Sequence, residues 1–141
     1  MASSQTESPL LTQAEKADKF KCYQLSVQDP EHEIDFFTQV YHEANGTDPL
    51  SLQEDFCGTF AICCEWVRSN PERTAVGVDL CGETLQWGQD HNLVKIDPCE
   101  QERIQLLEQD VRQKNPVQAD VLVAQNFSFW IFKTRKEVIE Y

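Results

Sequence analysis

The spacing of hydrophobic residues changes near residue 47. Before it, two runs carry apolar residues every three or four positions, which is the period of an amphipathic helix. The first run starts at Thr12, with Glu15 three residues on, a capping-box pattern, and we expect one helix from there to Val27. The second run covers residues 31–46 and ends in Asn-Gly, which is typical of a helix C-terminus.

After residue 47, short apolar runs alternate with helical stretches. This alternation is typical of βαβ units, so we predict an α/β fold: a Rossmann-like parallel sheet with flanking helices, preceded by a helical N-terminal segment. The expected strands are residues 50–56, 74–79, 103–110 and 120–125. The expected helices between and after them are residues 60–68, 82–93 and 133–141. The predicted organisation is a disordered stretch at residues 1–9, a helical segment at 10–46 and a sheet domain at 47–141.

The charge balance restricts the partners. The chain has 141 residues, enough for one domain, with 12 Lys+Arg against 24 Asp+Glu and a net charge of −12. Because this negative charge repels phosphate backbones, we expect no double-stranded nucleic acid as a partner. No apolar stretch approaches the roughly 20 residues that span a bilayer, so we expect no membrane partner.

Six cysteines raise the question of disulfides or a metal. The N-terminus has no apolar core of secretory type, so we expect a cytoplasmic protein with free thiols. Cys63 and Cys64 are adjacent and no His stands three to five residues from a Cys, so the spacing does not favour zinc. We expect Cys57, Cys63 and Cys64 to act as small buried hydrophobes.

Polar side chains follow each of the expected strands. In open parallel sheets the ligand lies outside the carboxyl ends of the strands, so these residues are candidates for one site. They are Glu54, Asp55, Cys57, Gly58 and Thr59 after the first strand, Asp79 and Leu80 after the second, Asp110 and Val111 after the third, and Gln125, Asn126 and Phe127 after the fourth.

Gly58 and Asp79 show what such a site can bind. Gly58 has no Cβ and allows backbone to approach a ligand, although a plain turn is an equal alternative. Asp79 follows about 20 residues later, at a position where an acid can accept hydrogen bonds from ribose hydroxyls. The alternative is that Asp79 is a helix N-cap or a first-turn acid. No GxGxxG follows, and the acids at this edge would repel a phosphate but attract a cation with an amine and hydroxyls. S-adenosylmethionine fits that description.

The strand ends resemble the class I S-adenosylmethionine-dependent methyltransferases. Residues 54–59 (EDFCGT), 75–80 (AVGVDL), 107–111 (LEQDV) and 120–126 (DVLVAQN) are similar to four motifs of that family, in order. The strings EDFCGT, CEWV (64–67) and AQNFSFWIFKTR (124–135) also resemble a subgroup of uncharacterised members.

The resemblance implies a methyltransferase that uses S-adenosylmethionine and acts on an unidentified acceptor, a small molecule or a protein. It implies Glu54 near the methionine amine, Asp79 at the ribose and Asp110 at the adenine. The full implied cofactor set is Glu54, Cys57, Gly58, Thr59, Asp79, Leu80, Asp110, Val111 and Gln125, and Asn126 and Phe127 are implied to contact the acceptor. A turn role for Asn126 is an equal alternative.

Two features depart from the family pattern. Phe56 and Phe60 stand where the family commonly has glycine. The family's sheet has seven strands and this chain predicts four, so we expect the N-terminal part of that fold, incomplete at the C-terminus, with the fourth strand as an exposed edge.

Some side chains outside the motifs are also open to interpretation. No general base can be named, because His32, His42 and His91 stand in polar helical surroundings and are expected at the surface. We expect Trp66 and Trp87 to be packing residues and favour the core for Phe132. Phe127, Phe129 and Trp130 are left open between core and acceptor pocket.

Other functions remain open. One is a truncated, non-catalytic module that binds S-adenosylmethionine or another protein. Another is a nicotinamide-dependent oxidoreductase, against which the missing GxGxxG argues. A last alternative is a redox or metal protein using the six cysteines.

Overall fold

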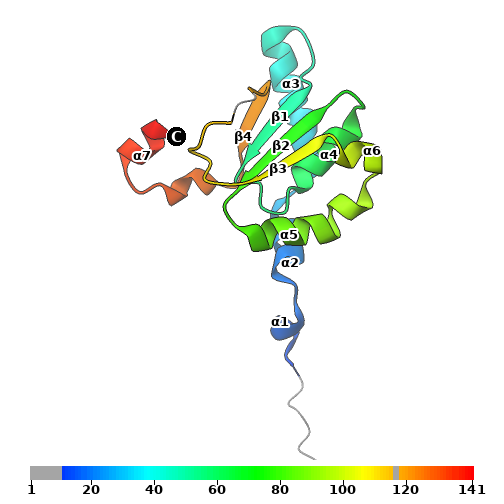
Figure 1. Ribbon diagram of the computed structural model, residues 1–141, viewed down its shortest axis with the longest axis vertical. Coiled ribbons are helices and arrows are strands. Elements are labelled where there is room, and N and C mark those ends of the chain that lie inside the picture. Colours follow the sequence, from blue (N-terminus) through cyan, green and yellow to red (C-terminus); the bar gives the residue numbers. More distant parts are fainter. Residues whose placement is uncertain (1–10, 116–117) are drawn as a thin grey trace, which may run out of the picture.

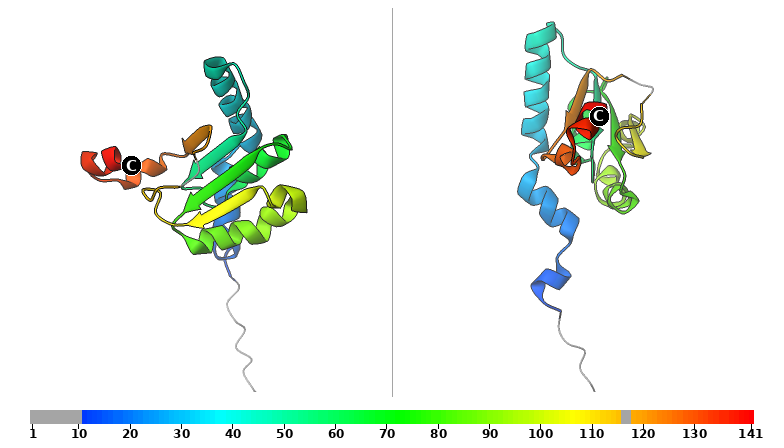
Figure 2. Two further views of the ribbon diagram at one scale, coloured as in Figure 1. Left: turned by 45° about the horizontal axis from the view of Figure 1, so that its top comes forward. Right: turned by 90° about the vertical axis from the view of Figure 1, so that its left-hand side faces the viewer.

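The computed structural model describes residues 11–115 and 118–141. The disordered stretch predicted at residues 1–9 lies outside the described residues. From residue 11 onward, three helices precede the sheet: α1 (Gln13–Lys16), α2 (Lys19–Val27) and α3 (Pro30–Asn45). α1 extends away from the sheet and α2 lies beside α5 (Gly82–His91), whereas α3 runs along one face of the sheet (Figures 1 and 2).

The prediction of one helix from Thr12 to Val27 was wrong at Asp18. The capping box of Thr12 and Glu15 is present and starts α1. Ala17 then adopts an extended conformation, and the Asp18 carboxylate accepts hydrogen bonds from the next helix's free backbone N–H groups, at Phe20 and Lys21. An N-cap that satisfies these groups starts a new helix, so the chain turns between α1 and α2.

All four strands of the sheet are parallel. They are β1 (Ser51–Asp55), β2 (Thr74–Asp79), β3 (Ile104–Glu108) and β4 (Val121–Ala124), in the order β3-β2-β1-β4. The chain moves outward from β1 to β3 and then returns to the other side of β1. The gap between the ends of β1 and β4 is therefore the topological switch point, where open α/β sheets bind their ligands.

The core lies between the sheet and the helices on one face. α4 (Ala61–Ser69) packs against the strands and α3 packs on α4, while α5 (Gly82–His91) lies beside β3. Trp66 is fully buried and its indole Nε1 donates to the Thr74 carbonyl at 3.0 Å, so its predicted packing role is confirmed. The structure also contains three short helical segments that we did not predict from the sequence. They are η1 (Leu93–Lys95), α6 (Pro98–Gln101) and η2 (Ser128–Ile131).

β4 forms one of the two edges of the described sheet, as predicted, and β3 forms the other. Leu122 on β4 is 59% exposed. α7 (Arg135–Glu140) lies beyond the β4 edge (Figure 1). After α7, the Tyr141 hydroxyl donates a hydrogen bond to the Asp55 carboxylate of β1 at 2.8 Å. This bond ties the segment that follows β4 back to the sheet. None of the described helices is long and apolar enough to cross a membrane.

Candidate functional site

The loop after β1 has a left-handed backbone conformation at three residues, a conformation that glycine adopts most easily. Phe56, Gly58 and Phe60 have φ angles of 57°, 54° and 46°, all left-handed. This conformation costs an L-residue such as phenylalanine about 1–2 kcal/mol. Phe60 is fully buried, and a Cβ on Gly88 would lie 2.4 Å from its ring, so α5 offers a glycine where the ring needs room. Packing therefore holds Phe60 in a backbone conformation that favours glycine.

Asp79 ties this loop to the start of α5. One carboxylate oxygen accepts from the Gly58 N–H at 2.8 Å and the other from the Cys81 N–H at 2.8 Å. Cys81, not Asp79, is the N-cap of α5, so the alternative of an N-cap role is wrong. A carboxylate has about four acceptor positions, so Asp79 retains capacity for ligand hydroxyls.

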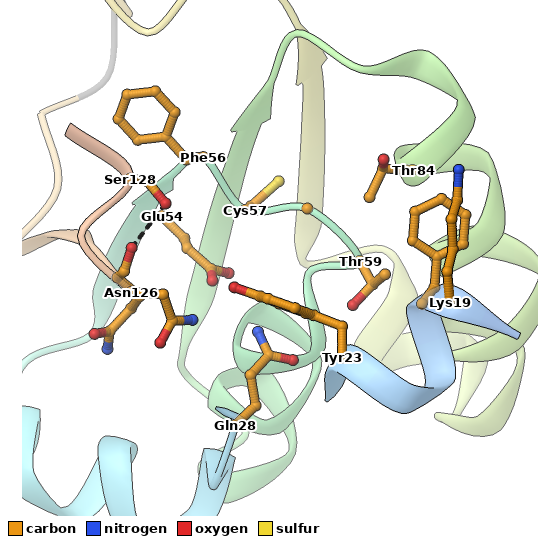
Figure 3. Close-up of a pocket in the computed structure, with 13 residues that line it drawn as sticks. Lys19, Tyr23, Gln28, Glu54, Phe56, Cys57, Thr59, Thr84, Asn126 and Ser128 are labelled. Carbon is orange, nitrogen blue, oxygen red and sulfur yellow. Dashed lines mark hydrogen bonds between the residues drawn. The ribbon is translucent and has the colours of Figure 1, made fainter. Parts of the chain in front are cut away.

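A first pocket opens at the switch point between β1 and β4 (Figure 3). This β1–β4 pocket has a volume of about 350 Å³. The lining residues that the sequence predicted are Glu54, Cys57, Gly58, Thr59, Gln125 and Asn126. The lining residues it missed are Lys19, Phe20, Tyr23 and Gln28 from the region of α2, Phe56 from the loop, Thr84 from α5 and Ser128 from η2.

Glu54 dominates the electrostatics of the β1–β4 pocket. Its side chain is 2% exposed, and the Cys63 thiol donates to its carboxylate at 3.1 Å. Burial raises the pKa of Glu54 to about 8, although the hydrogen bond from Cys63 acts in the opposite direction. No lysine or arginine among the described residues forms an ion pair with this carboxylate. A positively charged ligand group in the pocket would favour the ionised form.

A second pocket lies at the ends of β2 and β3. This β2–β3 pocket has a volume of about 650 Å³. Its lining includes the remaining predicted cofactor residues, Asp79, Leu80, Asp110 and Val111. Arg112 Nη2 lies 2.6 Å from Asp110 Oδ2 and Arg112 Nε lies 3.0 Å from Oδ1. These hydrogen bonds lower the pKa of Asp110 to about 2.

Phe56 lines both pockets. Its ring belongs to a small aromatic cluster with Phe132, 6.1 Å away, and Tyr141, 6.0 Å away. Phe132 is only half-buried, so the prediction that it belongs to the core was wrong: it packs on Phe56 at the pocket instead. A ligand that contacts the predicted residues of both the β1–β4 pocket and the β2–β3 pocket therefore passes beside Phe56.

The two predicted acceptor residues are placed differently. Asn126 and Phe127 follow β4 with φ angles of 54° and 58°, so both form the turn that was the alternative for Asn126. Asn126 still lines the β1–β4 pocket. Phe127 is 68% exposed and lines neither pocket, and Trp130 is also exposed at 66%.

Other predicted residues show no site of their own. The three histidines are exposed, as predicted, and Trp87 is half-buried on α5. The cysteines are free thiols, of which Cys57, Cys63 and Cys64 are buried, as the sequence predicted. Within residues 11–115 and 118–141 no group of His, Cys, Asp and Glu could hold a metal ion.

The fold is found in solved methyltransferases. No protein-family model and no curated protein matches the sequence. The plantazolicin methyltransferase BpumL, in complex with a triazolic desmethylPZN analog and SAH, matches with a TM-score of 0.66 and 17% identity, over 85% of this chain and 44% of that chain. CalS10, an amino pentose methyltransferase from Micromonospora echinaspora bound to SAM, matches with a TM-score of 0.65 and 16% identity, over 95% and 50%. KedS8, a sugar N-methyltransferase from a Streptoalloteichus species, matches with a TM-score of 0.66 and 16% identity, over 99% and 51%.

At these identities the comparison shows the fold. The predicted fold class is confirmed: a parallel sheet with flanking helices after a helical segment, as in these methyltransferases. The chain spans about half the length of the structures it matches.

Proposed function

We propose that this chain binds S-adenosylmethionine and transfers its methyl group to an acceptor. The observation that carries the proposal is the buried Glu54 carboxylate at the switch point, which has no cationic partner among the described residues. Burying an unpaired carboxylate is costly, and a ligand with an ammonium group and a sulfonium offsets that cost. Two of the structures with this fold hold SAM or SAH, which supports the same cofactor here.

The two pockets match the two arms of this ligand. In our assignment, the methionine arm lies in the β1–β4 pocket, with its amine near Glu54 and its backbone contacts at Cys57, Gly58 and Thr59. The nucleoside arm lies in the β2–β3 pocket. There Asp79 and Leu80 hold the ribose, and Asp110 and Val111 hold the adenine. Gln125 completes the cofactor set, and Asn126 and Phe127 remain our assigned acceptor contacts.

The cofactor brings a methyl group already activated by its sulfonium, so the protein has little covalent chemistry to perform. The described residues can hold both reactants in line and exclude water. Glu54 fixes the charged arm, the left-handed loop brings backbone close to it, and Asn126 at the pocket wall orients the acceptor. The exposed histidines give no side chain that we assign as a general base.

Calorimetric titration with S-adenosylmethionine tests the proposal. We expect binding with one site per chain, and transfer of a labelled methyl group when candidate acceptors are added. A folded chain that binds neither S-adenosylmethionine nor S-adenosylhomocysteine would overturn the cofactor assignment.

A non-catalytic module is the second candidate. It is favoured by exposed apolar side chains in the segment after β4: Phe127, Trp130, Ile131 and Ile139 are each more than 60% exposed. Among these, the Phe127 and Trp130 ring centroids lie 5.1 Å apart, and contiguous apolar surface often marks a contact with another protein. Cofactor binding without methyl transfer to any acceptor tried, together with a stable protein partner, would favour this candidate over the enzyme.

A further inference from the structure

Helix α2 forms part of the β1–β4 pocket, although none of its residues is buried. It is held by side-chain contacts to the sheet domain. Trp87 Nε1 donates to the Asp18 carboxylate at 2.8 Å, and Lys19 Nζ lies 2.8 Å from a Glu83 oxygen. An element with little buried apolar surface is among the first to open locally. The position of α2 therefore depends on a small number of polar contacts and on the Phe20 ring, whose centroid lies 5.6 Å from that of Trp87.

Gln24 makes the contact that links α2 to the cofactor loop. Its Oε1 accepts from the Thr59 hydroxyl at 3.0 Å and from Asn92 Nδ2 at 3.0 Å. Asn92 is 6% exposed and its Nδ2 also donates to the Thr59 carbonyl at 2.9 Å. These three side chains join α2, the left-handed loop and the end of α5.

Tyr23 is the side chain that this link places at the pocket. Figure 3 shows its ring extending along the pocket, with the hydroxyl pointing toward the Glu54 carboxylate. Gln28, just beyond α2, lines the same pocket, and its Oε1 is buried without a hydrogen-bond partner among the described residues. An aromatic face, a carboxylate and a free amide oxygen together suit a cationic ligand that carries N–H donors.

We infer that Tyr23 is a further cofactor-contacting residue whose ring faces the sulfonium, and that Gln24 is the positioning residue that seats it. The inference rests on the proposed function. An aromatic face attracts a cation, so Tyr23 favours the charged methyl donor over its neutral product. Gln24 acts through Thr59 and Asn92 and touches no reacting atom.

Parallel titrations with S-adenosylmethionine and S-adenosylhomocysteine test the assignment of Tyr23, because only the first carries the sulfonium charge. We expect Tyr23→Leu to lower the affinity for S-adenosylmethionine about tenfold and to change that for S-adenosylhomocysteine far less. Tyr23→Phe keeps the ring and should keep the ratio of the two affinities. The control is Leu25→Ala, an exposed apolar residue of α2 that does not line the pocket.

Gln24→Met tests the positioning role, because methionine has a similar length but accepts the two hydrogen bonds poorly and cannot donate the long one from Gln24 Nε2 to Asn92 Oδ1 at 3.4 Å. We expect both affinities to fall by a similar factor, about threefold to tenfold, as for the loss of one or two hydrogen bonds. Amide hydrogen exchange in α2 should become faster while exchange in α4 stays unchanged.

The outcomes separate this inference from the proposed function. If the wild-type chain binds neither compound, the proposed function is wrong. If it binds both and Tyr23→Leu leaves the affinity ratio unchanged, the Tyr23 assignment is wrong and the proposed function stands. If Gln24→Met changes neither affinity nor exchange in α2, the positioning role is wrong.

Discussion

The β1–β4 pocket and the β2–β3 pocket each contain a carboxylate, and the two environments shift the pKa in opposite directions. Glu54 is buried, and its pKa rises to about 8. Asp110 receives hydrogen bonds from Arg112, and its pKa falls to about 2. The first acid lacks a cation that a ligand can provide, whereas the second already has one from its own chain. We therefore expect the charged arm of the ligand at Glu54 and the neutral base at Asp110.

The largest effect should come from Glu54→Gln, which removes the ionisable carboxyl group and keeps the shape. The pKa of Glu54 is raised from 4.5 to about 8, so the folded protein holds a proton that the unfolded chain releases across this range. The wild-type free energy of unfolding should thus fall as the pH rises from about 4.5 to about 8. At pH 7 the variant should be more stable by about 3 kcal/mol, and it should bind S-adenosylmethionine much more weakly.

Urea denaturation at several pH values, with a cofactor titration at pH 7, measures both effects of Glu54→Gln. Glu72→Gln, at an exposed glutamate, is the matched control and should change neither quantity. A variant that unfolds with the same pH dependence as the wild type would show that Glu54 is not the group that titrates.

Asp79→Ala should have the next largest effect, because it removes the acceptor for two backbone N–H groups. Leaving such groups unpaired costs about 1–3 kcal/mol, so we expect a lower melting temperature as well as weaker cofactor binding. Asp79→Asn retains one acceptor oxygen and should recover part of the stability. If both variants keep the wild-type affinity in calorimetry, the ribose assignment fails.

Phe56 lines both pockets, and Phe56→Gly tests whether its ring restricts the space for the ligand. Glycine relieves the left-handed strain but loses the contacts with Phe132 and Tyr141. The relieved strain and the lost aromatic contacts are each worth about 1 kcal/mol and act in opposite directions, so we expect the free energy of unfolding to change by about 1 kcal/mol or less. We expect the affinity for the cofactor to be kept or raised. Phe56→Ala loses the ring and keeps the strain, so it should be less stable than the glycine variant. Equal stability of the two would contradict the strain.

The smallest effect should come from Arg112→Gln in the β2–β3 pocket. The low pKa of Asp110 stabilises the fold above its ordinary value of 3.8, and this contribution is lost as the pH falls toward about 2. The variant should therefore show a pKa of Asp110 in the ordinary range by carboxyl NMR titration. Because the adenine amino group no longer competes with the guanidinium, we expect slightly tighter cofactor binding; a large loss would show that Arg112 itself holds the ligand.

The strands and their polar ends could be predicted because their signals are local. The prediction for β2, residues 74–79, matches the structure in full, since a continuous apolar run that ends in an acid is typical of a strand buried on both faces. The pairing of the strand ends then follows from the parallel topology. Whether these residues bind the cofactor stays a prediction.

The features that the sequence did not predict depend on contacts between distant residues. Phenylalanine rarely adopts a left-handed backbone, and only the space above Gly88 explains why Phe60 does. Tyr23 and Gln28 belong to no motif, and α2 reaches the pocket through bonds such as the one from Thr59 to Gln24, 35 residues apart. The Asp18 N-cap was hidden inside an uninterrupted helical pattern.

The position of β4 has a consequence for synthesis of the chain. β1 pairs with β2 on one side and β4 on the other, and the bond from the Asp120 N–H to Ser51 Oγ closes 69 residues of chain. As the polypeptide leaves the ribosome, β1, β2 and β3 can assemble first. One edge of β1 then stays unpaired until β4 follows. An open edge of this kind can pair with other strands, so we expect the nascent chain to be prone to aggregation during this interval.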